Sequence, residues 1–265
     1  MDLAAATWPT IAEMMDSASV ALLPIGSTEQ HGPHLPTGTD HVIAKALATA
    51  ASERTDAIRL PTLPIGVSGH HRHFPGTLWV DGPKFRQFVR NWSKNIAAHD
   101  IRKIIFVNAH GGNVEPLREV GRDLHREEVA FATEWMWNES IPDLVAESFE
   151  RPGPHAGPKE TAMMLHIDPE TVDTESVERA RDHGVSDFDF ADFTVHGSRI
   201  HYDTIDNSPN GSFGDPTEAT AAIGEQLFTA ARDELVALIE WLEEQPLSAL
   251  LPQPPIRASS SSNST

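Results

Sequence analysis

The stretch that decides the fold is VALLPI at residues 20–25, followed by GSTEQHGPHLPTGTDH at residues 26–41. A continuous apolar run that ends at a glycine is typical of a strand buried on both faces. Residues 40–51 then show helical spacing and many alanines. The polar segment between them is rich in Gly and Pro, so it can fold back on itself. The stretch therefore predicts a strand, a loop rich in reactive side chains, and a helix.

Short apolar runs and longer amphipathic runs alternate along the rest of the chain. Further strands are predicted over residues 58–65, 103–107 and 128–134, and helices over residues 83–99, 114–125, 160–166 and 216–244, the last capped by Asp215. Prolines make 58–65 an irregular or edge strand. This order predicts an α/β fold with three α/β/α layers and a mostly parallel central sheet. In such sheets ligands bind beyond the carboxyl ends of the strands.

Length and composition bound the organisation of the chain. It has 265 residues, of which 39% are hydrophobic, and this suits a single catalytic domain over residues 1–251. Residues 252–265 are rich in Pro and Ser and are predicted to be a disordered tail. Residues 184–212 are polar and poorly periodic, which predicts long loops with a lid as one role.

The charge balance excludes several partners. Asp and Glu number 39 against 20 for Lys and Arg, giving a formal charge of -19. That charge argues against nucleic acid or an anionic membrane as partner. Only five of the 20 basic residues are Lys. A carboxylate-rich, lysine-poor surface predicts a halophilic protein, with an ordinary acidic enzyme as the alternative.

The cellular compartment is predicted from what the sequence lacks. No run approaches the roughly 18 apolar residues of a membrane span, and the first residues lack the pattern of a signal peptide. Cys is absent, which excludes disulfides and thiol nucleophiles. These features together predict a cytoplasmic protein.

The loop after the first strand carries candidate metal ligands. Glu29 and His31 are two residues apart, and in an extended segment this spacing points both side chains to one side. Asp40 lies at the start of the next helix. One Glu, one Asp and up to three His near a strand end suit a borderline metal such as zinc, manganese or iron.

Three further segments carry reactive side chains. His110 follows a predicted strand in NAHGGN, where a simple turn or an anion-binding loop is the alternative. Glu160 lies in HAGPKET, where it would point back at the loop, with helix capping as the alternative. The segment HHRHFPGT at residues 70–77 holds three histidines, at least one of which is expected to be exposed and idle.

Together these segments resemble the creatininase family of metal-dependent amidohydrolases. The matching motifs occur in family order between about residues 18 and 240: GSTEQHGPHLPTGTD (26–40), FPGT (74–77), NAHGGN (108–113), HAG (155–157) with Glu160-Thr161, and GDP (214–216). The resemblance implies a creatininase-like fold and hydrolysis of a C–N bond in a cyclic amide or formamide by a metal-bound hydroxide. It also implies two divalent ions, zinc or manganese or both, with iron possible.

The resemblance assigns roles to individual residues. Glu29, Asp40 and His110 match the ligands of one ion, while His31 and the bridging Asp40 match ligands of the second. Creatinine-cleaving members carry a further Glu where this chain has Gly112. Glu160 is the candidate replacement and a candidate catalytic residue. His155 matches a histidine that handles protons at the scissile amide.

Other residues are candidates for substrate binding or for orienting the ligands. Gln30, His34 and Asn113 are expected to orient them, and one of His71 and His73 to contact substrate. Creatinine-cleaving members have a tryptophan shortly before the histidine that matches His155, and this chain has none there. Trp135 and Trp137 are expected to line the pocket, with core packing as the alternative, and Arg151 to bind a phosphate or carboxylate.

Several functions remain open at this point. A creatinine-like amide is the first choice of substrate. The alternatives are a formamidopyrimidine ribotide, deformylated in flavin or deazaflavin synthesis, and a peptide-derived redox cofactor. From other classes, a two-metal phosphatase and a non-catalytic metal-binding assembly protein are retained. By analogy with the family we expect a homo-oligomer, a hexamer, acting on a small molecule, and the acidic surface predicts a haloarchaeal source.

Overall fold

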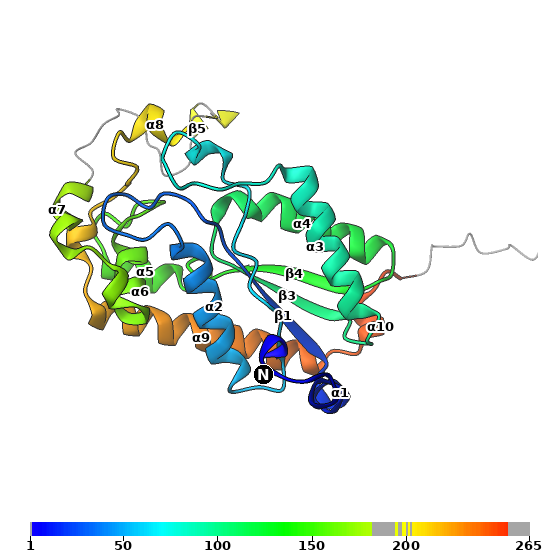
Figure 1. Cartoon of the computed structure of the whole chain (residues 1–265). Coiled ribbons are helices and arrows are strands. Elements are labelled where there is room, and N and C mark those ends of the chain that lie inside the picture. The colour runs from blue at the N-terminus through cyan, green and yellow to red at the C-terminus, as the bar shows by residue number, and fades with distance from the viewer. Residues whose placement is uncertain (1, 182–193, 196–197, 200, 202, 254–265) are drawn as a thin grey trace, which may run out of the picture.

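A four-stranded sheet forms the centre of the molecule (Figure 1). The computed structural model describes residues 2–181, 194–195, 198–199, 201 and 203–253. The strands, in the spatial order β2-β1-β3-β4, are β2 (Ile58–Arg59), β1 (Val20–Ile25), β3 (Lys103–Asn108) and β4 (Phe131–Met136). Every neighbouring pair is parallel, so all four carboxyl ends lie at one edge of the sheet. The predicted mostly parallel α/β fold is confirmed.

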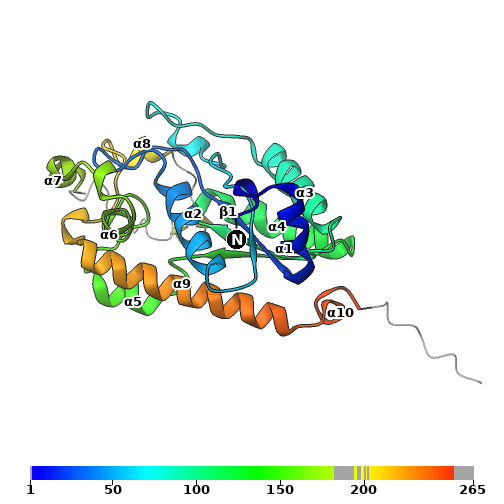
Figure 2. The ribbon, with the colours of Figure 1, turned by 60° about the horizontal axis from the view of Figure 1, so that its bottom comes forward.

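Helices cover both faces of the sheet, as the three-layer prediction requires. On one face lie α2 (Thr39–Ser52), α6 (Pro158–Ile167) and the long α9 (Ala221–Glu244), which Figure 2 shows running along the molecule. On the other lie α3 (Gly82–Ala97) and α4 (Val114–Arg126). Side chains of β1 alternate between the two cores, because successive residues of a strand point to opposite faces.

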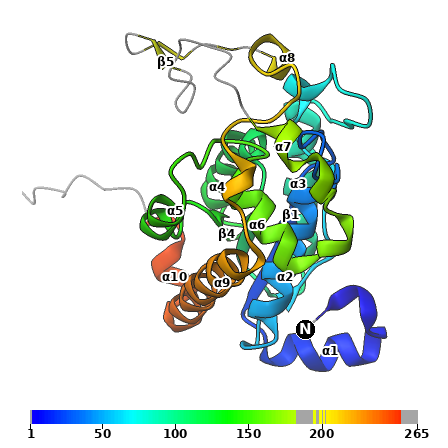
Figure 3. The same cartoon turned by 90° about the vertical axis from the view of Figure 1, so that its left-hand side faces the viewer.

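Shorter elements complete the described chain. They are α1 (Trp8–Ser17), α5 (Pro142–Ser148), α7 (Val177–Ala180), α8 (Thr204–Asn207), α10 (Leu247–Leu250) and the antiparallel pair β5 (Thr194–Val195) and β6 (Ser198–Arg199). Neither α1 nor α5 buries a residue fully, although apolar side chains of both, such as Met14 and Leu144, pack against the two cores. Figure 3 shows α8 and β5 at the end of the molecule opposite α1.

The strand predicted over residues 58–65 is much shorter than expected. Regular pairing stops at Arg59, although the Leu60 amide still donates to the Leu22 carbonyl at 2.8 Å and the Leu63 amide to the Pro24 carbonyl at 2.9 Å. Pro61 and Pro64 lack the N–H groups that a continuous ladder would need. The segment therefore follows the edge of β1 with interrupted hydrogen bonding.

Two other boundaries differ from the prediction. The strand expected over residues 128–134 starts three residues later, after Glu128, whose φ of 54° is incompatible with a strand. Asp215 caps a short 3₁₀ turn, Pro216–Glu218, rather than the long helix. Thr220 caps α9 instead, because its hydroxyl accepts from the Ile223 amide at 3.2 Å.

Parts of the chain lie outside the described residues. The loops predicted over 184–212 fall partly there, and β5, β6 and α8 are the regular elements that the described part of that region contains. The tail predicted over 252–265 is described only for its first two residues. The domain boundary at residue 251 stays a prediction. Among the described helices, none combines the length and apolar character needed to cross a membrane.

Candidate metal centre

Four of the predicted ligands meet at the carboxyl edge of the sheet. Glu29 and His31 lie in the loop after β1, Asp40 is the second residue of α2, and His110 follows β3. Because β1 and β3 are parallel neighbours, both loops emerge at the same place. All four side chains are buried, with exposed fractions of 0 to 4%.

The four side chains contact one another directly. His31 Nε2 lies 3.0 Å from Asp40 Oδ1. His110 Nδ1 lies 3.2 Å from Glu29 Oε2 and also 3.2 Å from Asp40 Oδ2. Asp40 therefore faces both histidines, one with each oxygen. That position between two nitrogen ligands is the geometry expected of a bridging carboxylate.

The carboxylates of this cluster are not satisfied by hydrogen bonds. Both oxygens of Glu29 and Oδ2 of Asp40 are buried without a hydrogen-bond partner in the described residues. A buried carboxylate oxygen without a partner costs about 1–3 kcal/mol or more, so such atoms need an explanation. A divalent cation with oxygen and imidazole ligands supplies one, because these donors are the ones that zinc, manganese and iron prefer. The donor set therefore fits a metal.

Backbone carbonyls fix which nitrogen of each histidine faces the cluster. His110 Nε2–H donates to the Val67 carbonyl at 3.1 Å, so the lone pair of the neutral ring is on Nδ1, toward Glu29 and Asp40. His31 Nδ1–H donates to the Glu29 carbonyl at 3.1 Å, which leaves Nε2 facing Asp40. Such outer hydrogen bonds orient metal-binding histidines and set their tautomer.

The pKa values show how strongly these charges depend on one another. Burial raises the pKa of Asp40, but His31 and His110 outweigh it and hold that pKa well below its usual value. Burial lowers the pKa of His31, but the Asp40 carboxylate outweighs it and raises that pKa to about 9. The pKa of His110 is likewise raised, against the effect of burial, mainly by Glu29. Without a metal, protons on the histidines neutralise the carboxylates.

A second group of side chains adjoins the first. Ligand atoms of His31, His155 and Glu160 lie within 4.8 Å of one another, and so do those of Glu29, His71 and His155. Glu160 has an exposed fraction of 7%, and burial raises its pKa. The structure thus brings Glu160 beside His31, where a replacement ligand for a second ion would have to lie.

Glu160 also performs the capping role given as its alternative. Its carboxylate accepts from the Ala156 amide, in the turn that precedes α6. Ala156 has a φ of 47°, so the turn is a tight one that points its amide at the first turn of the helix. Capping uses Oε2 only, which leaves the other oxygen for the cluster.

His155 is held as a neutral ring with one nitrogen toward the cluster. Its Nε2 lies 2.8 Å from the Gln30 carbonyl oxygen and 2.9 Å from the Gln30 side-chain amide nitrogen. When Nε2–H donates to the carbonyl, the lone pair is on Nδ1, which lies 3.6 Å from Glu29 Oε1. Burial, His31 and His71 lower the pKa of His155 well below the usual value. The ring is therefore a proton acceptor at neutral pH, and it can donate only a proton that it has first received.

His71 lies beside the cluster, with its Nε2 toward Glu29. The Gln30 side-chain amide lies 2.8 Å from His71 Nδ1, and the Thr204 hydroxyl 2.9 Å from the same atom. With the amide donating to Nδ1, the ring proton is on Nε2, which lies 3.3 Å from Glu29 Oε1. Burial lowers the pKa of His71 to about 3, so the ring is neutral. His71 thus orients Glu29.

Gly112 explains why the chain lacks the Glu found there in creatinine-cleaving members. A Cβ atom on Gly112 would lie 2.2 Å from the Val67 carbonyl oxygen and 2.5 Å from His110 Nε2. No side chain fits this close approach, which the Val67–His110 hydrogen bond requires. A second ion, if bound, would need its extra ligand from elsewhere, and Glu160 is the carboxylate beside His31.

The residues expected to orient the ligands lie around the cluster. Asn113 Nδ2 donates to the Gly26 carbonyl at 3.0 Å, and its Oδ1 accepts from the Val67 amide at 2.9 Å, so it joins three loops. His34 Nε2 is hydrogen-bonded to the Thr161 hydroxyl at 2.8 Å. Burial lowers the pKa of His34 to about 4. Asn113 and His34 fasten the loops and do not reach the cluster's carboxylates.

Four residues predicted as substrate contacts lie elsewhere. Trp135 and Trp137 are 9% and 1% exposed and belong to the core under α9, so the core alternative holds for both. His73 is 44% exposed and pairs with Asp203 at 3.2 Å, outside the cluster. Arg151 is exposed, and its backbone bonds the Glu218 carboxylate and the Asp215 amide. The alternation of side chains along β4 places the tryptophans, and the turn after His71 places His73. Residue type alone does not decide either position.

Two cavities adjoin the cluster, and residues that the sequence did not single out line them. The first, of about 400 Å³, includes Glu29, His70, His71, His110, His155, Asp203 and Thr204. The second, of about 540 Å³, includes Glu115, Arg118, Glu139, Lys159 and Glu160. Gly111 and Pro154 line both, so the cavities are neighbours. Lys159 could have been noted from its place beside Glu160, whereas Thr204 carries no sequence signal.

Comparisons with known proteins show what this chain is similar to. Residues 4–239 match a family model described as "Creatininase: Creatinine amidohydrolase". A mycofactocin precursor peptide peptidase of Mycobacterium ulcerans is 33% identical over 242 residues, covering 88% of this chain and 85% of that protein. A creatinine amidohydrolase of Pseudomonas putida is 30% identical over 177 residues, 60% of this chain and 68% of that protein.

Solved structures show the same fold. A crystal structure of a creatinine amidohydrolase homologue from Bacteroides fragilis superimposes with a TM-score of 0.79 at 25% identity, covering 93% of this chain and 98% of that one. Solved creatininases of this fold include a zinc–zinc type and a manganese form. The peptidase relative is mycobacterial, and none of these proteins bears on the predicted haloarchaeal source.

Proposed function

Because this chain belongs to the creatininase family, we propose that it is a two-metal hydrolase that cleaves the C–N bond of a peptide-like amide. The observation that carries the proposal is the set of carboxylate oxygens on Glu29 and Asp40 that form no hydrogen bond in the described residues and are buried against His31 and His110. Such a set is costly to the fold unless a cation occupies it.

The ligands divide into two groups that share Asp40. Glu29, Asp40 and His110 would hold one ion, and His31, Asp40 and Glu160 the other. When bound, two such ions supply Lewis acidity, which lowers the pKa of water and polarises a carbonyl oxygen. The chain contributes by orienting the ligands, since Val67 and Glu29 carbonyls fix the histidine rings and His71 fixes Glu29.

His155 handles the proton in this proposal. Its neutral ring presents the Nδ1 lone pair to the cluster, so it accepts the proton that the attacking water loses. The imidazolium that forms keeps its Nε2–H bond to the Gln30 carbonyl and then protonates the departing nitrogen. An amide nitrogen leaves badly unless it is protonated, so this transfer completes the reaction.

A peptide-like substrate suits the chain better than creatinine. The similarity to the peptidase extends over more of this chain than the similarity to the creatinine amidohydrolase. Two adjoining cavities, of about 400 and 540 Å³, also offer room on both sides of a scissile bond, which a small cyclic amide does not need. The peptide-like substrate is thus supported by the similarity to the peptidase and by the volume of the two cavities.

A substrate panel tests this proposal. Protein loaded with manganese, zinc or iron(II) would be assayed, at high salt, with short peptides, creatinine, a formamidopyrimidine ribonucleotide and generic phosphate esters. We expect peptide cleavage to exceed creatinine cleavage. If creatinine or the ribonucleotide is cleaved faster than the peptides, the protein is instead a creatinine amidohydrolase or a deformylase. If the phosphate esters are cleaved, the protein is a phosphatase. Bound metal with no turnover on any substrate would favour the non-catalytic metal-binding protein.

A further inference from the structure

Lys159 is a buried cation with no partner of its own. It is 8% exposed and lines the 540 Å³ cavity together with Glu160. Within the described ranges its ammonium forms no hydrogen bond and no ion pair. Burying an unpaired ammonium is unfavourable. In a chain with 39 acidic residues an internal carboxylate partner would be easy to supply, so its absence needs a reason.

The other cation of this cavity is already neutralised. Arg118 Nε lies 3.4 Å from Glu134, its Nη1 lies 3.6 Å from Glu115, and its Nη2 lies 3.9 Å from Glu139. Three carboxylates surround this guanidinium. Lys159 also feels the carboxylates of Glu139 and Glu160, but it forms no hydrogen bond or ion pair with either in the described residues, so of the two cations it is the one available to an anion.

The position of Lys159 gives no benefit to its own helix. It is the second residue of α6, and a positive charge in the first turn opposes the helix dipole. The helix terminus and the ammonium instead add their positive potentials at one place, which favours a negatively charged group in the cavity. Neither helix stability nor an internal ion pair accounts for Lys159.

We propose that Lys159 anchors an anionic oxygen group of the substrate, a carboxylate or phosphate, in the cavity beside the metal centre. The inference rests on the proposed function and extends it to substrate class. Because Lys159 and Glu160 are adjacent and line the same cavity, the anion lies near the scissile amide. For a peptide, a terminal carboxylate close to the cleaved bond meets this requirement. Lys159 is thus a specificity residue, and it takes no part in bond cleavage.

The test measures binding, and its readout does not depend on turnover. Calorimetry would compare N-acetylglycine, the neutral N-acetylglycinamide and N-acetyl-O-phosphoethanolamine on metal-loaded protein. We expect a charged ligand to bind about ten- to a hundred-fold more tightly than the amide, the range for hydrogen bonds to charged groups. A larger gain for the carboxylate identifies a carboxylate substrate, and a larger gain for the phosphate identifies a phosphate ester.

Variants separate Lys159 from the metals as the anion's partner. Lys159→Met should remove the preference for the charged ligand and Lys159→Arg should keep part of it, with metal content unchanged in both. Lys84→Met, at a lysine that is 74% exposed, is the matched control and should behave like the parent. A preference that survives in Lys159→Met assigns the anion to the metals and overturns the proposal, as would equal binding of all three ligands by the parent.

Hydrolysis of neutral amides distinguishes the two proposals. If Lys159→Met keeps the parent's turnover of a neutral peptide amide, the proposed function holds whatever the binding experiment shows. If the parent cleaves no amide yet shows the Lys159-dependent preference, the anion site stands and the proposed activity fails.

Discussion

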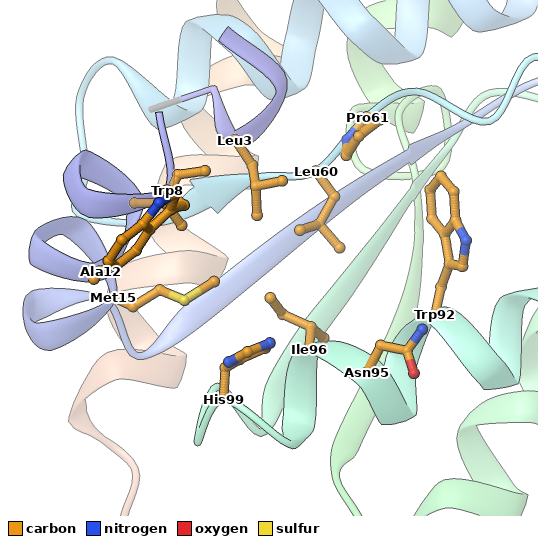
Figure 4. A pocket seen from close by; sticks show the side chains of 11 residues that line it. Leu3, Trp8, Ala12, Met15, Leu60, Pro61, Trp92, Asn95, Ile96 and His99 are labelled. Carbon is orange, nitrogen blue, oxygen red and sulfur yellow. The ribbon is translucent and has the colours of Figure 1, made fainter. Parts of the chain in front are cut away.

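An apolar groove between α1 and α3 (Figure 4) is similar in size to the two cavities at the carboxyl edge of the sheet but differs from them in the side chains that line it. The groove, of about 510 Å³, is lined mainly by apolar side chains, among them Leu3, Trp8, Met15, Leu60, Trp92 and Ile96. The two cavities, of about 540 and 400 Å³, adjoin a cluster of buried carboxylates and imidazoles. Volume alone therefore does not identify the site.

The two regions differ in the energetic cost of the groups that they expose or bury. Trp8 at the groove is 80% exposed, a small cost that any surface carries. Glu29 and Asp40 are at most 2% exposed, and three of their oxygens face histidine rings without forming a hydrogen bond in the described residues. A fold retains such atoms against a cost of kilocalories per mole only where something binds them. The carboxyl edge is the functional end on that ground.

Removing the bridging ligand should give the largest effect. Asp40→Asn keeps the shape but not the charge that faces His31 and His110. Metal affinity should fall by more than the roughly 10–100-fold that loss of an outer hydrogen bond costs, and activity should fall with it. Metal analysis after dialysis and steady-state kinetics measure both.

The groove supplies the matched control. Trp8→Ala should leave metal content and turnover unchanged and alter the free energy of unfolding by only about 0.5 kcal/mol, because the indole is exposed. If Asp40→Asn keeps its metals, or if Trp8→Ala loses them, the division between the two regions is wrong.

Removing the proton carrier should give the next largest effect. His155→Gln should keep its metals but lose about 10²–10⁴ in turnover, the usual range for general acid–base catalysis. The loss should be smaller for an anilide or ester whose leaving group needs no proton. Equal losses for good and poor leaving groups would assign His155 to stabilising charge in the transition state. Loss of metal would make it a ligand.

The pH dependence of stability separates the cluster from the groove, which holds few titratable groups. The pKa of His31 is raised to about 9, so folding of the metal-free chain takes up a proton. This contribution to stability is fully present below the ordinary pKa of 6.5 and is lost as the pH rises through about 9. The melting temperature of metal-free protein should therefore fall by several degrees over that window.

Metal-loaded protein should behave in the opposite sense. The ions bind deprotonated rings, so affinity should rise over the same pH window and binding should release protons. Calorimetry in buffers of different ionisation enthalpy counts those protons. A metal-free melting temperature that is flat from about pH 6 to about pH 9.5 would show that the histidines are neutral before metal binds.

Salt should give the smallest effect and act on the exposed surface. The charge of -19 is spread over one chain, and the Debye length falls from about 10 Å at 0.1 M to about 3 Å at 1 M salt. The melting temperature should rise over that range in potassium chloride. Metal affinity of the buried cluster should change less, because buried charges are screened less. A melting temperature that stays flat or falls would remove the halophile interpretation.

The cluster of candidate metal ligands could be predicted because its residues lie in short contiguous motifs next to strand ends; their role as ligands stays a prediction. Glu29, His31 and Asp40 lie within twelve residues of one another, and His110 follows a neighbouring parallel strand. Placement was harder where one residue of register decides it. Trp135 and Trp137 were candidates for the pocket but belong to the core, and His71, unlike His73, reaches Glu29. The spacing of residues along the chain does not determine the direction in which a side chain points after a turn.

The sequence by itself determined the alternation of strands and helices, the acidic surface and the set of metal-binding side chains, because these follow from local pattern and composition. The tertiary structure decided what depends on contacts between distant segments. Only the packing of Val67 against Gly112 shows why no Glu fits there, and only the fold brings Glu160 beside His31. It also leaves Lys159 buried without a partner among the described residues. Which side chains form hydrogen bonds or ion pairs depends on distances between segments far apart in the sequence, and residue order alone does not give those distances.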